Sequence, residues 1–468
     1  MMKHQYLEEF VCDDGFRFLG AHLFSDGRER LLLSSQDGTM LLLSEDLGDQ
    51  LLARDLPDDF KFKLVQRAFA TMMHSRPVSN MSENVLPQFF MIDLTKACTL
   101  QCVYCFRDLE DKTVMSEQVL DDICRYILKY CRDHHKKSVN IQAWGGEPML
   151  AFDYIRRIQG HFEGSGVEAQ LFVETNGTTL TPELAREARQ RKIKIGLSID
   201  GLPELHDRHR PMVSGKGSFD RMRAGLKAMH ENGYSNCHTS ITVVSKHTLP
   251  HIEEMVRYYC EELKLPQFKF NIVKPNPMMK ATGMEVSPEE VRDFARRMFD
   301  TLVLMHRQGH SAVEVNISTK ILNVLRRGCS NICLSRGCMG GRKIIAFDQK
   351  ARIYTCDLMD LQSDAFGSVY DDRDLVEMVN EAIETHDFYK RKKDTRCAEC
   401  PWYFYCRGGC TSAVKYKTGA YGGGIDEVEC AYNSVLYPEI IKLFLHEPEM
   451  LQSLVQDELA FYDARHFV

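Results

Sequence analysis

Strand-like and helix-like segments alternate six times between residues 88 and 320, which constrains the fold more than any other feature of this 468-residue chain. Each apolar stretch rich in β-branched and aromatic residues precedes an amphipathic one. The pairs are QFFMIDLT with SEQVLDDICRYILKYC, SVNIQAW with AFDYIRRIQGHF, AQLFVETN with PELAREARQRK, IKIGLSID with SFDRMRAGLKAMHE, HTSITVV with LPHIEEMVRYYCEEL, and QFKFNIV with SPEEVRDFARRMFDTLVLMH. Successive strand–helix units form parallel sheets. We therefore predict an α/β fold over residues 88–320, with a parallel sheet that forms a full or a partial TIM-like barrel, and of these we adopt the partial (β/α)6 form.

Further regions flank the predicted barrel. Residues 1–85 contain RLLLSSQDGTMLLLS, which predicts a β-hairpin around Asp37-Gly38, and then DDFKFKLVQRAFATMM, which predicts a helix. The polar segment HSRPVSNMSEN separates this small β/α domain from the barrel. Residues 325–440 are rich in cysteine, and we expect residues 441–468 to form a helical tail.

Charge and hydropathy exclude several classes of partner. The net charge is −7 and the pI is about 6.2, so no general basic field attracts nucleic acid. The N-terminus, MMKHQYLEEF, is polar and acidic, and no apolar run reaches the ~18–20 residues that span a bilayer. The sequence predicts a cytoplasmic protein that binds neither nucleic acid nor membrane.

Seventeen cysteines are many for a cytosolic chain. Disulfides are disfavoured in the cytosol, so clustered cysteines indicate metal binding or redox chemistry. The isolated ones are expected to act as small buried hydrophobic residues, and they are Cys12, Cys124, Cys131, Cys237 and Cys260. The others form two groups, at 98–105 and 329–430.

The first group contains three cysteines and lacks a fourth. KACTLQCVYCFRD places Cys98, Cys102 and Cys105 in the spacing C-x3-C-x2-C, directly after the first barrel strand. A closed structural zinc site uses four protein ligands, and disulfides need an even number of cysteines. Three thiolates leave one metal coordination position open for chemistry.

Polar turns follow the next three strands of the barrel. They are WGGEP at 144–148, ETNGT at 174–178 and SIDG at 198–201. Taken singly, such glycine-containing turns are common. Because the carboxyl ends of parallel strands meet at one rim, we expect these turns to lie beside the cysteines. The candidate binding residues are Gly145, Gly146, Glu147, Asn176, Ser198 and, from DRHRP, Arg210.

The cysteine spacing, with Tyr104 before the third cysteine and GGEP after the second strand, resembles the radical S-adenosylmethionine (SAM) superfamily. The resemblance implies a 4Fe–4S cluster on Cys98, Cys102 and Cys105, whose fourth iron chelates the amino and carboxylate groups of SAM. Reductive cleavage of SAM then yields a 5′-deoxyadenosyl radical. The same resemblance assigns the methionine amino group to Gly145, Gly146 and Glu147, and other parts of SAM to Asn176, Ser198 and Arg210.

The second cysteine group resembles the SPASM extension of radical enzymes that modify peptides and proteins. CAECPWYFYCRGGC and the cysteines around it match the spacing of that extension, although Ala351 replaces its usual glycine. The resemblance implies two auxiliary 4Fe–4S clusters. One would be held by Cys397, Cys400, Cys406 and Cys430, and the other by Cys338, Cys356, Cys410 and either Cys333 or Cys329, with Cys333 preferred. Two structural zinc sites are the alternative that spacing alone leaves open.

Two smaller predictions concern the cysteine-rich region. The aromatic run 402–405 is expected to pack the clusters away from water, because no basic stripe accompanies it for base stacking. Asp357 directly follows Cys356, and the resemblance to anaerobic sulfatase-maturating enzymes implies that it is the base in substrate oxidation. An exposed loop aspartate is the alternative interpretation.

The resemblance favours a radical SAM peptide maturase. It would abstract a hydrogen atom from a ribosomally synthesised precursor peptide and install a thioether, a carbon–carbon or ether crosslink, or an oxidised residue. Residues 1–85 would bind the leader of that peptide by strand addition, or serve as a structural cap. An external donor such as flavodoxin or ferredoxin would supply electrons. Formation of formylglycine from a cysteine or serine of a sulfatase and a non-enzymatic, zinc-scaffolded binding protein are the two alternatives.

Overall fold

The structure is a computed structural model of the chain. It describes residues 2–12, 16–25, 27, 30–34, 38–67, 69–72, 86–108, 110–235, 238–274, 276, 279, 283–326, 333, 338–357, 365–390 and 394–455.

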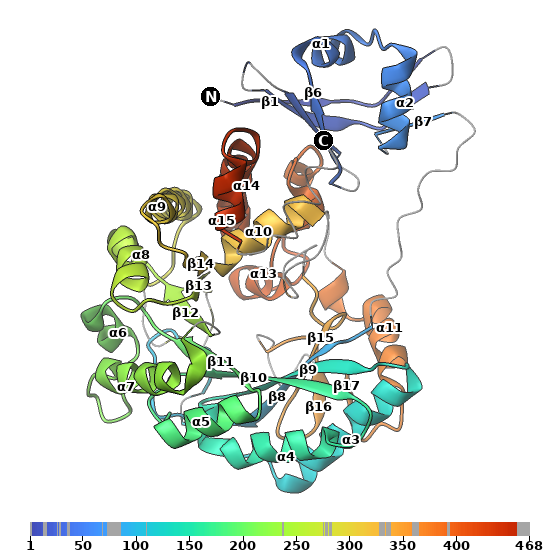
Figure 1. Ribbon diagram of the computed structural model, residues 1–468. Helices are drawn as coiled ribbons and strands as arrows, with labels where there is room; N and C mark the ends of the chain where they lie inside the picture. Colours follow the sequence, from blue (N-terminus) through green and yellow to red (C-terminus); the bar gives the residue numbers. More distant parts are fainter. Residues whose placement is uncertain are drawn as a thin grey trace.

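A ten-stranded sheet forms the centre of the molecule (Figure 1). Its order is β14-β13-β12-β11-β10-β9-β8-β15-β16-β17, parallel from β14 to β15 and antiparallel beyond. The strands are β8 (Phe89–Thr95), β9 (Ser138–Gly145), β10 (Glu168–Thr175), β11 (Lys194–Ser198), β12 (Thr239–Val244), β13 (Gln267–Ile272), β14 (Val313–Glu314), β15 (Ile344–Phe347), β16 (Arg352–Tyr354) and β17 (Gly367–Ser368). The six predicted barrel strands are confirmed in consecutive order, and the barrel is partial because its edge strands β14 and β17 do not pair.

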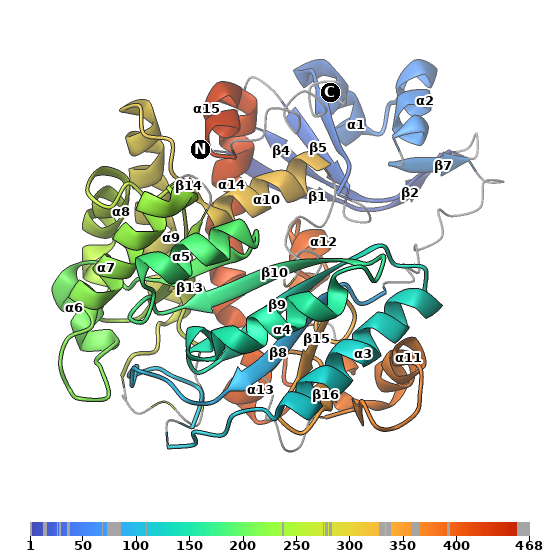
Figure 2. The same cartoon turned by 60° about the horizontal axis from the view of Figure 1, so that its bottom comes forward.

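Helices cover the outer face of this curved sheet (Figures 1 and 2). They are α3 (Glu117–Asp133), α4 (Phe152–Phe162), α5 (Pro182–Gln190), α6 (Pro203–His209), α7 (Phe219–Met229), α8 (Ile252–Glu261) and α9 (Pro288–Arg307). All six predicted helices are present, and α6 is an addition within the fourth unit. In α3 the buried positions include Leu120, Ile123, Cys124 and Ile127, a spacing that places one apolar stripe on the sheet.

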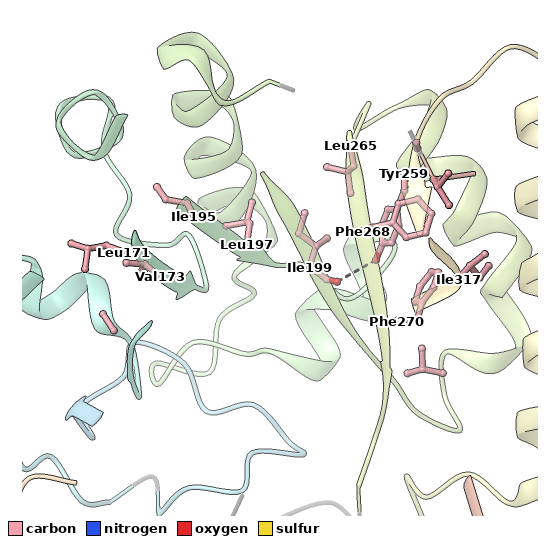
Figure 3. Close-up of a cluster of buried hydrophobic side chains, with 14 of the residues drawn as sticks. Leu171, Val173, Ile195, Leu197, Ile199, Tyr259, Leu265, Phe268, Phe270 and Ile317 are labelled. Carbon is pink, nitrogen blue, oxygen red and sulfur yellow. Dashed lines mark hydrogen bonds between the residues drawn. The ribbon is translucent and has the colours of Figure 1, made fainter. Parts of the chain in front are cut away.

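Aliphatic and aromatic side chains fill the space between the sheet and the helices. Figure 3 shows this core around β10 to β13, where Leu197 and Phe268 are fully buried. The buried Tyr259 hydroxyl donates to the carbonyl of Ile199 at 3.2 Å, which satisfies the polar atom of that side chain. This packing holds the strands, and therefore the turns at their ends, in fixed positions.

The N-terminal region forms two small sheets with their own core. One has the order β1-β4-β5-β6 and the other β2-β3-β7. The elements are β1 (Lys3–Leu7), β2 (Phe10–Val11), β3 (Phe16–Phe18), β4 (Ala21–Ser25), β5 (Arg30–Ser34), β6 (Met40–Leu43), α1 (Glu45–Ala53), α2 (Asp58–Gln66) and β7 (Ala70–Met72). The predicted hairpin is β5–β6. The helix predicted over DDFKFKLVQRAFATMM is wrong at its end, because Ala70–Met72 pairs with β3 as a strand.

Aromatic stacking joins this N-terminal domain to the cysteine-rich region. The Phe24 ring stacks on Trp402 at 5.3 Å between centroids, and Trp402 stacks on Tyr437 at 5.2 Å. The Tyr405 hydroxyl donates to the Gly38 carbonyl at 3.2 Å. Part of the aromatic run at 402–405 therefore holds the N-terminal domain in place, and its packing around clusters stays a prediction.

The C-terminal helices lie on both sides of the sheet (Figure 1). They are α10 (Val315–Arg326), α11 (Leu375–Thr385), α12 (Tyr403–Cys406), α13 (Thr411–Thr418), α14 (Glu427–His446) and α15 (Pro448–Ser453). Helices α10, α13 and α14 lie on the inner side, whereas α11 extends the outer layer beside α3. There His134 Nε2 lies 2.8 Å from the carboxylate of Asp374, the residue that caps α11.

Two predicted domain boundaries fall inside continuous structure. The ten-stranded sheet crosses the boundary predicted near 320–325, because β15 pairs with β8. Helix α14 crosses the boundary predicted at 440. The expected helical tail is present in α14 and α15 up to residue 453, and its residues 456–468 lie outside the described part of the chain.

Several cysteine predictions can be compared with the structure. Cys124 and Cys131 are fully buried and Cys260 is 6% exposed, as expected of small hydrophobic residues, while Cys12 is half-buried. Two further cysteines of the prediction, Cys237 and Cys329, lie outside the described residues.

Ala351 has a left-handed backbone. Its φ is +60° in the turn between β15 and β16, and its side chain is fully buried. Residues with a Cβ rarely adopt this conformation, whereas glycine adopts it freely. A glycine would adopt this turn without strain, so the alanine changes the energy of one turn and none of the predicted ligands.

Candidate active site

The cysteine loop after β8 is fastened to the segment after α6 by backbone hydrogen bonds. The N–H of Gln101 donates to the Pro211 carbonyl at 2.9 Å, and the N–H of Val103 donates to the His209 carbonyl at 3.0 Å. The loop that carries the three clustered cysteines is thus aligned against residues 209–213.

Two glycines bring the end of β9 against the start of the same loop. Gly145 has φ of +146°, and a Cβ there would lie 2.2 Å from the Thr95 carbonyl oxygen. A Cβ on Gly146 would lie 2.4 Å from the Ala97 carbonyl oxygen. The N–H of Gly146 donates to the Thr95 carbonyl at 2.6 Å. The glycine pair therefore permits two backbones to pack in direct contact.

Glu147 is 1% exposed and accepts three hydrogen bonds from the protein itself. Its donors are the Met149 N–H at 3.0 Å, the Thr175 hydroxyl at 2.7 Å and the Asn176 N–H at 2.8 Å. Burial raises the pKa of the Glu147 carboxyl, and these donors oppose the shift. The carboxylate holds the turn after β10 in place.

Asn176 links that turn to the cysteine loop. Its side-chain amide donates to the Thr99 hydroxyl at 3.0 Å and to the Cys98 sulfur at 3.7 Å. Its amide oxygen accepts from the Thr178 N–H at 2.9 Å. Turns that the sequence predicts on one rim are therefore in direct contact.

A cavity of about 910 Å³ opens at this rim. The predicted residues in its barrel-side wall are Cys98, Cys102, Cys105, Gly145, Gly146, Asn176, Ser198 and Arg210. Glu147 is not among the described residues of the wall. The contact of Glu147 with the SAM amino group stays a prediction. The hydrogen bonds of its carboxylate show that it supports the turn after β10.

The three thiols of this wall are close to one another. Burial raises the pKa of the Cys98 thiol to about 11, and the charge of Cys105 adds to the shift. Burial raises the pKa of Cys102 to about 12, where Arg210 opposes the shift and both other thiols add to it. Among the described residues no three His, Cys, Asp or Glu side chains are grouped as ligands of a single metal ion. Three neighbouring soft donors that face a cavity fit a multi-iron cluster with one open iron.

The same cavity has a second wall built from the C-terminal region, which includes Cys333, Cys410 and Asp357. Cys333 is exposed, and its thiol lies close enough to Cys338 and Cys410 for their charges to raise its pKa. The pKa of Cys356 is also raised, by burial and then by Asp357, Cys338 and Cys410. These four cysteines are therefore neighbours, although they come from separate segments of the chain.

Three of the four remaining predicted ligands lie near one another. Burial raises the pKa of the Cys430 thiol to about 11, and the charges of Cys400 and Cys397 add to the shift. Burial also raises the pKa of Cys406 to about 12, and there the charge of Glu429 adds to the shift. The structure thus brings Cys397, Cys400 and Cys430 together.

Charged side chains border the second wall. The Arg107 guanidinium pairs with Asp93 at 2.7 Å, and both side chains are at most 10% exposed. Burial raises the pKa of Asp357, an effect that Arg107 opposes. The Lys274 ammonium lies 3.5 Å from the Asp426 carboxylate. Although burial works against it, the negative charge of Cys410 and Asp426 raises the pKa of Lys274.

Sequence reasoning missed most charged residues of the cavity wall, and Glu174, Lys269 and Lys274 are among them. Burial raises the pKa of the Glu174 carboxyl to about 7, opposed by Lys269. Its Oε2 has no hydrogen-bond partner among the described residues. Glu174 belongs to the ETNGT motif, so its place at a strand end is the signal that could have found it.

Comparison with known proteins identifies the barrel. Residues 92–259, which include the cysteine loop and the turns that contact it, match the model of the Radical SAM superfamily. This part of the chain is similar to a radical SAM domain. The similarity to that superfamily implies an enzyme that uses SAM and a 4Fe–4S cluster. The neighbouring thiols Cys98, Cys102 and Cys105 are the donor set that fits this cluster.

Individual relatives align with most of this chain. The cysteine-type anaerobic sulfatase-maturating enzyme of Clostridium novyi is 24% identical over 327 residues, which are 67% of this chain and 84% of the relative. The mycofactocin maturase MftC of Mycolicibacterium smegmatis is 24% identical over 353 residues, 72% of this chain and 81% of the relative.

Solved structures share the fold. Native anSMEcpe with bound AdoMet and the Cp18Cys peptide has a TM-score of 0.65 at 20% identity, over 76% of this chain and 99% of that one. Streptococcus suis SuiB bound to precursor peptide SuiA has a TM-score of 0.53 at 16% identity, over 90% of this chain and 99% of that one. In the described part of this chain, no helix is long and apolar enough to cross a membrane.

Proposed function

We propose that the protein is a radical SAM peptide maturase, which removes a hydrogen atom from a precursor peptide and installs a crosslink or an oxidised residue. The observation that carries the proposal is the cavity of about 910 Å³ that thiols of the barrel share with thiols of the C-terminal region. A cavity of this volume accommodates SAM together with a short stretch of peptide. When bound, SAM and the cluster supply the 5′-deoxyadenosyl radical.

The residues of the chain have distinct roles in this proposal. On the barrel side, Cys98, Cys102 and Cys105 hold the SAM-binding cluster, and the wall residues Gly145, Gly146, Asn176, Ser198 and Arg210 orient SAM. Asp357, on the opposite wall, accepts a proton from the substrate residue as it is oxidised. It is half-buried in the cavity wall, which favours this role over that of an exposed loop aspartate.

Two auxiliary 4Fe–4S clusters are part of the proposal. Cys333, Cys338, Cys356 and Cys410 hold the first, which is supported by the mutual proximity of these thiols. Cys397, Cys400, Cys406 and Cys430 hold the second, supported by the proximity of three of the four. A flavodoxin-like or ferredoxin-like protein supplies the electrons.

The proposal gives each of the three main predicted domains one role. Residues 88–320 bind SAM, residues 325–440 form the SPASM domain, and residues 1–85 bind the leader of the peptide. An antiparallel sheet with open edges at β1 and β6 can accept the leader as an added strand. The fold of SuiB, solved with a precursor peptide, aligns over 90% of this chain, whereas that of anSMEcpe aligns over 76%.

Sulfatase maturation is the second candidate. The similarity to the Clostridium novyi enzyme favours it, since 84% of that relative aligns. The substrates separate the two candidates, because a sulfatase maturase modifies a cysteine or serine in a sulfatase peptide.

The test begins with anaerobically reconstituted full-length protein. We expect about twelve irons per chain, from three clusters of four, and formation of 5′-deoxyadenosine on reduction with SAM. Candidate peptides encoded near the gene and a sulfatase peptide are then compared by mass spectrometry. Modification of the full-length precursor peptide, and its loss when the leader is removed, supports the proposal. Modification of the sulfatase peptide alone refutes it in favour of the second candidate, and zinc in place of iron refutes both.

A further inference from the structure

Asp200 is a fully buried acid just outside the cavity. It lies in the SIDG turn after β11, is 0% exposed, and is absent from the described residues of the cavity wall. An aspartate is almost never buried in this way unless it is paired. Its partners therefore indicate what the side chain does.

The Asp200 carboxylate joins three segments that are distant in the sequence. Its Oδ1 accepts from the Val243 N–H at 2.9 Å, near the end of β12. The Arg210 guanidinium reaches both oxygens, with Nε 3.0 Å from Oδ2 and Nη2 3.2 Å from Oδ1. The Tyr104 hydroxyl donates to Oδ2 from within the cysteine loop.

The backbone of Asp200 is held as well. Its N–H donates to Nδ1 of the buried His206 at 3.2 Å. This contact requires the imidazole tautomer that leaves Nδ1 without a proton. The direction of Asp200 is therefore fixed through both its backbone and its side chain.

The charge at Asp200 is fixed by its neighbours. Burial alone would raise the pKa of the carboxyl, but the Arg210 guanidinium reverses the effect and holds the pKa below its usual value. Arg210 is itself only 7% exposed. Two buried opposite charges in an ion pair need each other, because removing one leaves the other uncompensated.

Tyr104 and Arg210 place this pair beside the thiols. Tyr104 stands between Cys102 and Cys105 in the sequence and lines the cavity. The Arg210 guanidinium lies 5.4 Å from the centre of the Tyr104 ring and also lines the cavity. A displacement of the Asp200 carboxylate would therefore also displace Tyr104 and Arg210, two residues of the barrel-side wall.

We propose that Asp200 is a positioning residue of this radical SAM enzyme. It acts through Tyr104 and Arg210: it sets the conformation of the cysteine loop before a cluster binds, and it fixes the direction of the Arg210 guanidinium towards SAM. The role rests on the radical SAM chemistry of the barrel and is independent of which peptide is modified.

The test compares two Asp→Asn variants of the full-length protein. Asp200→Asn keeps the size of the side chain and removes the charge that Arg210 needs. The control is Asp207→Asn on the neighbouring helix α6, because the Asp207 carboxylate accepts from the Phe219 N–H at 2.7 Å and so supports α7.

The first measurement is hydrogen exchange in the iron-free protein. We expect the amides of Gln101 and Val103 to exchange about tenfold faster or more in Asp200→Asn, as is typical when a supporting interaction around a ligand site is lost. The second is equilibrium binding of SAM to the reconstituted protein, where we expect the Kd to rise by about tenfold or more. The third is the EPR spectrum of the reduced cluster, whose change on addition of SAM should be weaker. Asp207→Asn should match the wild type in all three.

These measurements separate positioning from general stabilisation. A role in stability alone would lower the melting temperature of Asp200→Asn and leave the loop exchange and the SAM affinity of the folded protein unchanged, which would overturn the proposal. If Asp200→Asn does not fold, Tyr104→Phe carries the test, since it deletes only the hydroxyl that binds Asp200. Unchanged loop exchange and SAM affinity in Tyr104→Phe would then overturn it. Failure of the peptide-maturase function leaves these measurements unaffected, because none of them uses a peptide.

Discussion

Replacing Glu147 with Gln tests whether the GGE motif acts on the protein or on SAM. The Glu147 carboxylate accepts from Met149, Thr175 and Asn176, at 2.7–3.0 Å. A glutamine amide can accept at one end only, so its NH2 group must face at least one of these donors. In the best orientation the amide oxygen keeps two donors and the Asn176 N–H loses its acceptor.

The magnitude follows from this loss. A hydrogen bond to a charged group contributes about 1.5–3 kcal/mol, and a buried donor left unpaired costs a similar amount, so we expect Glu147→Gln to lower the free energy of unfolding by about 2–4 kcal/mol. For a domain of the size of the barrel this corresponds to a melting temperature about 5–15 °C lower.

Thermal unfolding of the iron-free protein measures this effect without SAM. Glu168→Gln is the matched control, because Glu168 is exposed at the start of the same strand β10 and should leave the melting temperature unchanged. SAM binding to the reconstituted variants is measured in parallel. A Glu147→Gln protein with wild-type melting temperature but abolished SAM binding would refute the reasoning and return Glu147 to the cofactor site.

Three further perturbations follow from the geometry. Gly145→Ala places a Cβ 2.2 Å from a carbonyl oxygen, so an iron assay of the reconstituted variant should show a loss of about four irons per chain. The control is Gly160→Ala, whose Cβ meets nothing within 4 Å and which should keep these irons. Burial raises the pKa of Glu174 from 4.5 to about 7, so its folded carboxyl stays protonated where the unfolded one ionises, and stability is lost as the pH rises through that range. The free energy of unfolding of Glu174→Gln, relative to that of the wild type, should therefore rise by up to about 3 kcal/mol between about pH 4 and about pH 8. Urea unfolding of the two iron-free proteins measures this. The same pH dependence of the unfolding free energy in both proteins would contradict the prediction. Trp402→Ala should lower the free energy of unfolding by about 3–5 kcal/mol, because it removes the ring that stacks on the N-terminal domain. In the same urea titration Phe62→Ala should change the free energy of unfolding little, because the Phe62 side chain of that domain is 62% exposed.

The barrel could be predicted from the sequence because each of its units carries its own local signal. Strands such as 89–95 are buried on both faces, and the helices between them bury one stripe, so the two periods differ clearly. The rule that polar turns at strand ends share a rim correctly places Asn176 beside Cys98.

What the sequence could not predict depends on contacts between distant segments. IIAF at 344–347 is too short for its period to distinguish strand from helix, and only pairing with β8 makes it β15. The motif GGE does not reveal that the Glu147 carboxylate also accepts hydrogen bonds from positions 149, 175 and 176. Asp200 has the sequence context of an ordinary turn, and its three partners come from positions 104, 210 and 243.

The attachment of the C-terminal region determines how far apart the two groups of thiols lie. The cysteine loop leaves β8, and β15 of the C-terminal region pairs with that same strand, with Phe347 opposite Ile92. Across the cavity, Lys274 follows β13 and pairs with Asp426, which caps α14 by accepting from the Glu429 N–H. The C-terminal region is therefore attached near both sides of the barrel mouth by contacts of the protein itself. The separation between the two groups of thiols is then a property of the folded chain, set before any cluster occupies either wall.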